Sequence, residues 1–203
     1  MGVKERKERQ KVEMKDLILQ SAHQLFLSKG FEEVSIRNIA EAIEYSPATI
    51  YLYFKDKDDI FYALHREAFK IFNTYIAPIV TIKDPLERLF AMGEKYMQFS
   101  FANPKYYEIM FMTESPMRCD ENAEEWKEGE RALNFLEGIV SECKEHGHFK
   151  NQNPKTLSFT IWSFMHGMCS LIIRDRMRCY PEDEREGIQV NGFEAFKMML
   201  KAL

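Results

Sequence analysis

Apolar residues recur at helical spacing along almost the whole chain, and this periodicity constrains the fold more than any other feature. Near the N-terminus, Leu17, Ile18, Leu25 and Phe26 share one stripe with Ala22. Strands would appear as alternating polar and apolar residues, and such segments are almost absent. The pattern predicts an all-α protein.

Capping residues and glycines divide this periodicity into separate helices. A polar N-cap accepts a hydrogen bond from a first-turn amide, and proline at the first helical position gives up no intrahelical bond. Four dipeptides combine the two: Ser46-Pro47, Asp84-Pro85, Asn103-Pro104 and Asn153-Pro154. With Ser35 and Asp56 as further caps and Gly30 and Gly147 as stops, they predict about nine helices, over roughly 11–29, 35–43, 46–54, 56–78, 84–102, 104–114, 121–146, 154–178 and 190–202.

Charge is distributed unevenly along the chain. Through Lys57 there are 10 Lys and Arg against 9 Asp and Glu, and the remainder has 18 against 23. A near-neutral N-terminal part is therefore followed by an acidic one. Without a global basic field, any affinity for DNA has to come from individually placed cations and backbone amides.

Several function classes lack their motifs here. The chain has no Gly-rich phosphate loop, nucleophile elbow or HExxH sequence, so we expect no enzyme activity. The four cysteines have no CxxC spacing, and we expect neither a metal nor a cofactor. No run of 18 apolar residues and no secretory h-region occurs, which predicts a cytoplasmic protein without a membrane partner.

Three short helices in the first 55 residues, with a tight turn between the second and third, predict a helix-turn-helix. The chain resembles the N-terminal signature of TetR-family regulators at Ile18-Leu19-Gln20-Ser21-Ala22-His23-Gln24-Leu25-Phe26, Gly30-Phe31, Ile39-Ala40 and Ser46-Pro47-Ala48-Thr49-Ile50-Tyr51-Leu52-Tyr53-Phe54-Lys55-Asp56-Lys57. The resemblance implies a DNA-binding domain over residues 12–72 and a C-terminal ligand-binding and dimerisation domain over 73–203. It also implies a homodimeric repressor that binds a palindromic double-stranded operator and releases it when a small-molecule effector binds.

The expected DNA contacts follow from side-chain chemistry on this motif. Small residues at the start of the third helix allow close approach to the major groove, tyrosine phenols reach phosphates, and an arginine can bind guanine O6 and N7 together. Lys57 adds a cation beside the backbone. The expected contact residues are Arg37, Tyr45, Ser46, Pro47, Ala48, Thr49, Tyr51, Leu52, Tyr53 and Lys57.

Glu44 departs from the family pattern, which usually has glycine in this turn. We expect Glu44 to adopt a costly left-handed conformation and to bring a negative charge near DNA. An alternative interpretation follows: a small-molecule-binding helical protein with a vestigial helix-turn-helix.

The second domain is rich in methionine and aromatic residues. Ten of the twelve methionines lie after residue 90, and such side chains suit either a helical core or an adaptable pocket for an apolar or aromatic effector. Asn103 to Phe111 resembles a sixth-helix segment of these regulators, and Trp162 to Gly167 resembles the tryptophan-x-x-x-histidine-glycine (WHG) feature of one group. The ligand-binding candidates are Met97, Met110, Phe111, Phe135, Trp162, Met165, His166 and Cys169.

A dimer is also expected, because short recognition helices make too few base contacts in a monomer. Two stripes are candidates for an intersubunit four-helix bundle: Leu157, Ile161, Phe164, Met168 and Leu171, with Phe193, Phe196 and Leu200 on the last helix. The same stripes could instead form the core of one chain. Gly167, inside a helix, is expected to allow close approach of another helix or a ligand.

Overall fold

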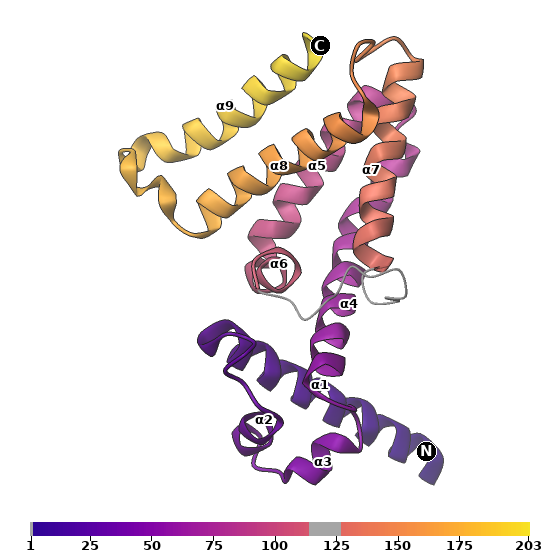
Figure 1. The fold of residues 1–203 in the computed structure, drawn as a ribbon, viewed down its shortest axis with the longest axis vertical. Coiled ribbons are helices and arrows are strands. Elements are labelled where there is room, and N and C mark those ends of the chain that lie inside the picture. The colour runs from indigo at the N-terminus through magenta and orange to yellow at the C-terminus, as the bar shows by residue number, and fades with distance from the viewer. Residues whose placement is uncertain (1, 114–126) are drawn as a thin grey trace. The chain divides into compact units, whose positions relative to one another are not determined.

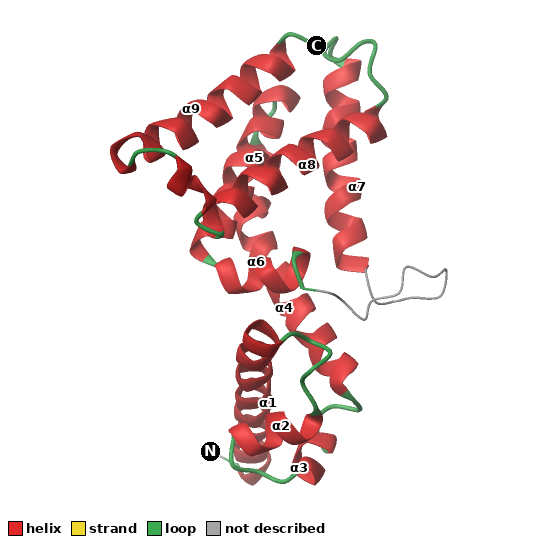
Figure 2. Ribbon diagram, turned by 60° about the vertical axis from the view of Figure 1, so that its left-hand side comes forward, coloured by secondary structure: helices red, strands yellow, loops and turns green. Residues whose placement is uncertain are grey.

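The computed structural model describes residues 2–113 and 127–203, and the regular structure in these ranges is helical (Figures 1 and 2). The expected all-α class is confirmed. The α-helices are α1 (Val3–Lys29), α2 (Ile36–Ala42), α3 (Pro47–Tyr51), α4 (Lys57–Ile76), α5 (Pro85–Ala102), α6 (Pro104–Phe111), α7 (Lys127–Glu145), α8 (Pro154–Ile173) and α9 (Glu182–Lys201). Two short 3-10 helices, η1 (Ala77–Thr81) and η3 (Arg176–Cys179), follow α4 and α8.

The chain forms two compact units. Among the described residues, the first unit, called the head, comprises residues 2–70 and 105–113, and the second, called the body, comprises residues 71–104 and 127–203. Helix α6 therefore packs with the N-terminal helices, although it lies far from them in sequence. The domain limits expected from the sequence, 12–72 and 73–203, are not tested by this division into units and remain a prediction.

The expected helix starts are confirmed where a cap and proline occur together. The side chains of Ser46, Asp84 and Asn153 accept hydrogen bonds from the amides of the third residue after each. Ser35 caps α2 in the same way. These positions agree because capping depends only on neighbouring residues.

Two helix starts differ from the expected ones. Helix α1 begins at Val3 instead of near residue 11, and its added turns are almost wholly exposed, so no apolar stripe marks them. Helix α9 begins at Glu182 instead of near residue 190, directly after Pro181, with three acidic residues in its first turn. The expected start of the 121–146 helix lies partly outside the described residues.

The body is built around α5, which packs against both α7 and α8, while α7 also packs against α8. Buried Phe99, Val140 and Ile161 represent the three helices in this core. On its surface, the guanidinium of Arg88 donates a 2.8 Å hydrogen bond to the carboxylate of Glu142 and links α5 to α7.

Helix α9 completes the core of the body. The ring of Phe164 on α8 stacks on that of Phe196, with centroids 3.8 Å apart and an interplanar angle of 5°. Leu157, Ile161, Phe193, Phe196 and Leu200 are all buried within the chain. Of the two interpretations of these stripes, the structure therefore supports the intrachain core. Leu171, by contrast, is 53% exposed.

Among the described helices, one, α8, has the length and apolar composition of a membrane-spanning helix. A core helix of a soluble bundle passes the same test, so this single match is weak evidence. Leu157, Ile161, Met165 and Cys169 bury one side of it against the rest of the body.

Candidate nucleic-acid interface

The head is organised around one apolar core that positions α2 and α3. Ile39 and Ile50, one from each helix, are fully buried and belong to the same cluster as Ile18, Phe26 and Phe61. Burying side chains of this size stabilises the native state by about 1.5–3 kcal/mol each. The orientation of α3 on the head is thus set by its inner face.

The turn between α2 and α3 contains the expected strain. Glu44 has a φ of 60°, so its predicted left-handed conformation is confirmed. The amide of Tyr45 donates a 2.9 Å hydrogen bond to the carbonyl of Ala40, which closes the turn. Ser46 then begins α3, and its hydroxyl accepts a hydrogen bond from the amide of Thr49.

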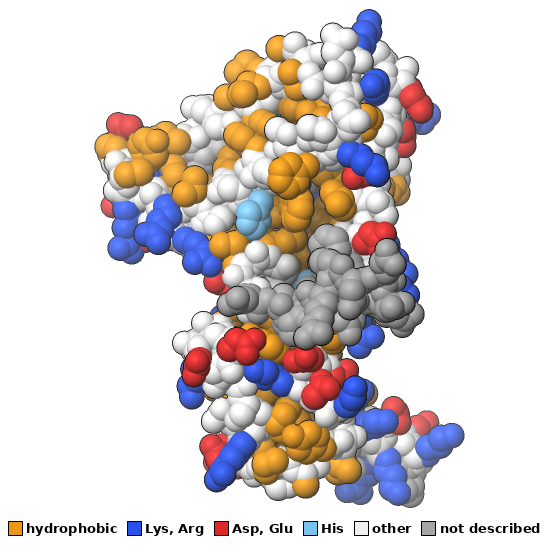
Figure 3. Space-filling model, in the orientation of Figure 1, with side chains coloured by type: hydrophobic (Ala, Val, Ile, Leu, Met, Phe, Trp, Pro, Cys, Tyr) orange, Lys and Arg blue, Asp and Glu red, His pale blue; other side chains and the backbone are white. Residues whose placement is uncertain are grey.

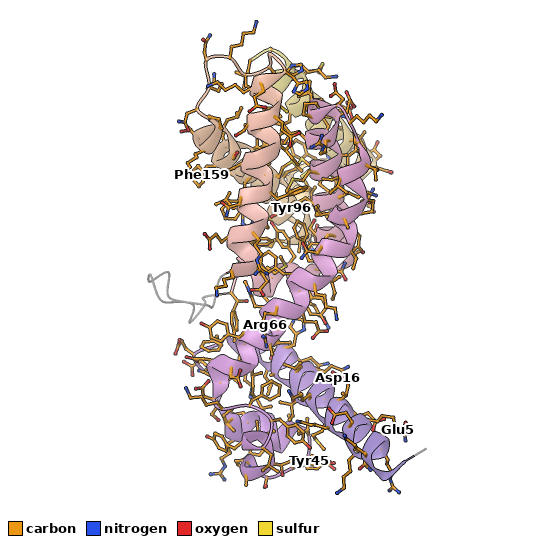
Figure 4. The ribbon with its side chains drawn as sticks, turned by 90° about the vertical axis from the view of Figure 1, so that its right-hand side faces the viewer. Glu5, Asp16, Tyr45, Arg66, Tyr96 and Phe159 are labelled. Atoms are coloured by element: carbon orange, nitrogen blue, oxygen red, sulfur yellow. The ribbon has the colours of Figure 1, made fainter. Side chains whose placement is uncertain are left out.

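The outer face of this motif carries most of the expected DNA-contact residues. Tyr45, Ser46, Pro47, Ala48, Tyr51 and Leu52 are exposed, and Thr49 and Tyr53 are half-buried. Figure 4 shows Tyr45 at the surface of the head, and Figure 3 shows hydrophobic side chains gathered over α2 and α3. Six of the ten expected contact residues are therefore exposed on this segment.

Lys57 lies in the first turn of α4, as expected, and its ammonium makes contacts within the head. Its ammonium donates hydrogen bonds to the carbonyls of Phe31 at 2.8 Å and Glu32 at 3.3 Å, and lies 4.1 Å from the centroid of the Phe31 ring. These three contacts connect α4 to the segment after α1. Lys57 therefore stabilises the packing of the head. Lys55, by contrast, is 88% exposed, and its ammonium lies 3.8 Å from the carboxylate of Asp56.

Arg37 is also engaged within the head. Its Nε donates a 2.9 Å hydrogen bond to the carboxylate of Glu41, one helical turn away on α2. Both side chains are largely exposed, so this ion pair is weak and can exchange for another partner. A guanine contact by Arg37 nevertheless requires that exchange.

Helix α6 is attached to the head by contacts that the sequence analysis did not identify. Nε2 of His23 on α1 lies 3.1 Å from the carbonyl oxygen of Lys105, and the phenol of Tyr106 donates a 2.7 Å hydrogen bond to Glu67 on α4. Burial lowers the pKa of His23, which favours a neutral ring that donates to the carbonyl. His23 lies inside the apolar stripe of its helix, and that buried position was the available signal.

The ligand-binding candidates divide between the two units. Met110 and Phe111 belong to the head, where Phe111 packs edge-on against Phe69. The other six lie in the body: Met165 and Cys169 are buried, and Met97, Phe135, Trp162 and His166 are half-buried. Their role in ligand binding remains a prediction.

Two ionisable side chains of the body, Cys169 and His166, have pKa values shifted by burial. Burial raises the pKa of the Cys169 thiol to about 11, although its hydrogen bond to the Ser100 side chain opposes the shift, so the thiol stays protonated at neutral pH. Burial also lowers the pKa of His166. Among residues 2–113 and 127–203, no group of three His, Cys, Asp or Glu side chains is placed to hold a metal ion.

The all-α fold, with α2 and α3 joined by a tight turn, is that of a helix-turn-helix protein with a second helical unit. Residues 18–64 match the model of bacterial regulatory proteins of the tetR family, and residues 89–190 match a tetracyclin repressor-like C-terminal domain. The chain belongs to the TetR family of transcriptional regulators. The narrower resemblance to the WHG group remains a prediction.

Comparisons with individual proteins agree with this family. The chain is 26% identical over 156 residues to the HTH-type transcriptional regulator HbdR of Aromatoleum sp. (strain CIB), covering 76% of this chain and 68% of HbdR. Two further curated regulators match over only 38% and 25% of their own lengths. These relatives are named as transcriptional regulators, which are not enzymes.

Solved structures with the same fold cover most of the chain. AibR, solved in complex with isovaleryl coenzyme A and operator DNA, superimposes with a TM-score of 0.70 at 20% identity, over 92% of this chain and 97% of that one. FadR from Bacillus subtilis, solved in complex with stearoyl-CoA, has a TM-score of 0.65 at 17% identity, over 88% and 95%.

Proposed function

We propose that this protein is a cytoplasmic repressor that binds a palindromic operator as a homodimer and releases it when a small molecule binds. The observation that carries the proposal is the exposed outer face of α3, held on a buried core by its inner face. Such a face fits the major groove, where a helix can approach base edges.

The operator contacts proposed here come from two kinds of side chain. Pro47, Ala48, Thr49 and Leu52 meet base edges, since they lie on α3 or its C-cap. Tyr45, Ser46, Tyr51, Tyr53 and Lys55 flank them and meet phosphates, which fixes the register on the duplex. Arg37 and Lys57 contribute mainly through the contacts that they make within the head.

A second copy of the chain is proposed to cover an apolar surface on α8 and α9. The exposed large residues of these helices are Phe159, Leu171, Val190, Met198 and Met199, each more than half exposed, and Figure 4 shows Phe159 directed outward. Exposed apolar residues grouped on neighbouring helices favour an interface over solvent. Sedimentation velocity of Leu171→Glu, with Val80→Glu as an exposed control outside these helices, tests this: only Leu171→Glu should give monomers.

The proposed effector has an apolar part that enters the body. The candidate residues there are methionines, aromatic residues and half-buried His166, which suit an apolar ligand with few polar groups. Since two structural neighbours were solved with coenzyme A thioesters, isovaleryl coenzyme A and stearoyl-CoA are the first probes. Binding should shift a two-state dimer away from the operator-competent conformation, with α4 transmitting the change between units.

A ligand-binding protein with a vestigial head is the second candidate. Glu44 favours it, because this residue combines a left-handed conformation with an exposed negative charge beside α3. Fluorescence anisotropy with duplexes tiled from the DNA flanking the gene, across a salt series, separates the two. Salt-sensitive binding to one palindromic duplex supports the repressor, and equal binding to all duplexes supports the vestigial head.

A further inference from the structure

The outer face of α3 is unusually apolar for a surface that meets DNA. Leu52 is 78% exposed, more than any other large hydrophobic residue among those described, and Tyr51 is 57% exposed. Ala48 lies four residues before Leu52 on the same side of the helix and is also exposed. Covering a solvent-exposed apolar side chain with a binding partner removes apolar surface from water, which lowers the free energy of the complex.

The amide and charged side chains that read bases by hydrogen bonds are missing from this face. Between Tyr45 and Leu52 there is no Asn, Gln, Arg, Lys, Asp or Glu, which are the residues that recognise guanine, adenine and cytosine in the major groove. The hydroxyls of Ser46 and Thr49 lie 3.1 Å apart, and Ser46 also accepts from the Thr49 amide. Their hydrogen-bonding capacity is thus partly used within α3.

We propose that the head recognises its operator mainly through the 5-methyl groups of thymine, with Leu52 and Ala48 as the specificity-determining residues. Thymine is the base that presents a methyl group in the major groove, and apolar side chains are its complement. The matching half-site contains adjacent T·A pairs, with the thymines on the strand that faces Ala48 and Leu52. This inference rests on the proposed function and specifies the DNA that the same surface binds.

Deoxyuridine tests the inference, because it pairs like thymidine and lacks only the methyl group. The full chain first selects duplexes from a random-sequence pool, and one selected duplex is then resynthesised with deoxyuridine at single half-site positions. Removing one contacted methyl group should raise the Kd about fourfold. Removing the equivalent methyl group from both half-sites should raise the Kd about fifteenfold. Deoxyuridine placed outside the half-sites should leave the Kd unchanged.

Variants of the full chain provide a second test. Because the Leu52 side chain is largely exposed, Leu52→Ala should leave folding intact. This variant should bind the thymidine duplex more weakly than the parent, and its Kd should change little when thymidine is replaced by deoxyuridine. Val80→Ala, also exposed but in the body, should bind like the parent. Sequence-specific binding that ignores deoxyuridine, or that depends instead on Glu44 as tested by Glu44→Gln, would overturn the inference alone. Failure to enrich any sequence would overturn the proposed function and this inference with it.

Discussion

The phenol of Tyr106 on α6 donates a 2.7 Å hydrogen bond to the carboxylate of Glu67 on α4. The two residues are 39 positions apart in sequence and both are half-buried. Burial and the adjacent carboxylate raise the pKa of Tyr106, so the phenol keeps its proton as the donor. Together with the His23 contact to Lys105, this bond attaches α6 to the head.

Tyr106→Phe should loosen α6 without changing its shape. Loss of a hydrogen bond to a half-buried carboxylate should destabilise the attachment by about 1 kcal/mol, equivalent to about fivefold faster amide exchange across Pro104–Phe111. Hydrogen–deuterium exchange of the full chain measures this. Tyr180→Phe, at an exposed tyrosine, is the control, and equal exchange in both variants would contradict the prediction.

Lys57 and Lys55 should differ in their effects on DNA binding. Lys57→Met removes two hydrogen bonds to carbonyls and a ring contact, so it should lower the free energy of unfolding by about 1–2 kcal/mol. Because its ammonium faces the head, the slope of log Kd against log salt should stay the same. Lys55→Met should reduce that slope by about 1 and leave stability unchanged.

A smaller salt slope for Lys57→Met would show that its ammonium turns outward to a phosphate when DNA binds. Urea unfolding and an anisotropy titration at several salt concentrations provide both readouts for each variant. Comparing the two variants therefore distinguishes a lysine that stabilises the head from a lysine that contacts DNA.

The strained turn and the helix starts that have a polar cap followed by proline could be predicted because their causes are local. Ser46 and Asn153 need only the amides that follow them, and Glu44 needs only its place in a short turn. The exposed face of α3 was predictable for a similar reason, since one inward stripe through Ile50 leaves the remaining side outward.

Contacts between distant segments could not be predicted in this way. The ammonium of Lys57 donates to the carbonyls of Phe31 and Glu32, which lie 26 and 25 residues earlier in the sequence. The spacing of apolar residues does not predict hydrogen bonds of this kind. The same holds for His23 and Lys105, which are 82 residues apart. The start of α9 is different, because its acidic first turn after Pro181 is a local helix-start pattern. The predicted start near residue 190 was therefore too late for a reason that the sequence itself contains.

His23 should make the stability of the protein depend on pH. Its pKa is lowered by burial below the unfolded value of about 6.5. The unfolded state therefore binds more protons between the two values, so the free energy of unfolding is constant above about pH 7 and falls as pH drops below 6.5. The hydrogen bond to the Lys105 carbonyl and the charge of Glu67 oppose this shift, and the charge of the Lys105 side chain adds to it.

His23→Gln should flatten this dependence, since an amide can still donate to the Lys105 carbonyl but does not titrate. His166, whose pKa burial also lowers, contributes in the same direction, so His23→Gln with His166→Gln should be flatter still. Urea unfolding at pH 7.5 and 5.5 measures the difference. A parent curve that is flat over this range would refute the prediction.

Two helical glycines in the body should respond oppositely to alanine. A Cβ at Gly93 on α5 would lie 3.0 Å from two ring atoms of Phe193 on α9 and 3.6 Å from Met165. Overpacking of this kind costs about 1–3 kcal/mol. That cost should exceed the roughly 1 kcal/mol by which alanine favours a helix over glycine. Gly93→Ala is therefore expected to lower the melting temperature.

Gly167 on α8 has no such neighbour: apart from the nearby backbone of its own helix, a Cβ there meets no described atom within 4 Å. The expected close approach of another helix is thus not found within the described chain, and approach by a ligand or a second copy remains a prediction. Gly167→Ala should raise the free energy of unfolding by up to about 1 kcal/mol in dilute protein. If the variant is instead less stable, and increasingly so at higher protein concentration, then a second copy lies against this face and the helix-propensity argument fails there.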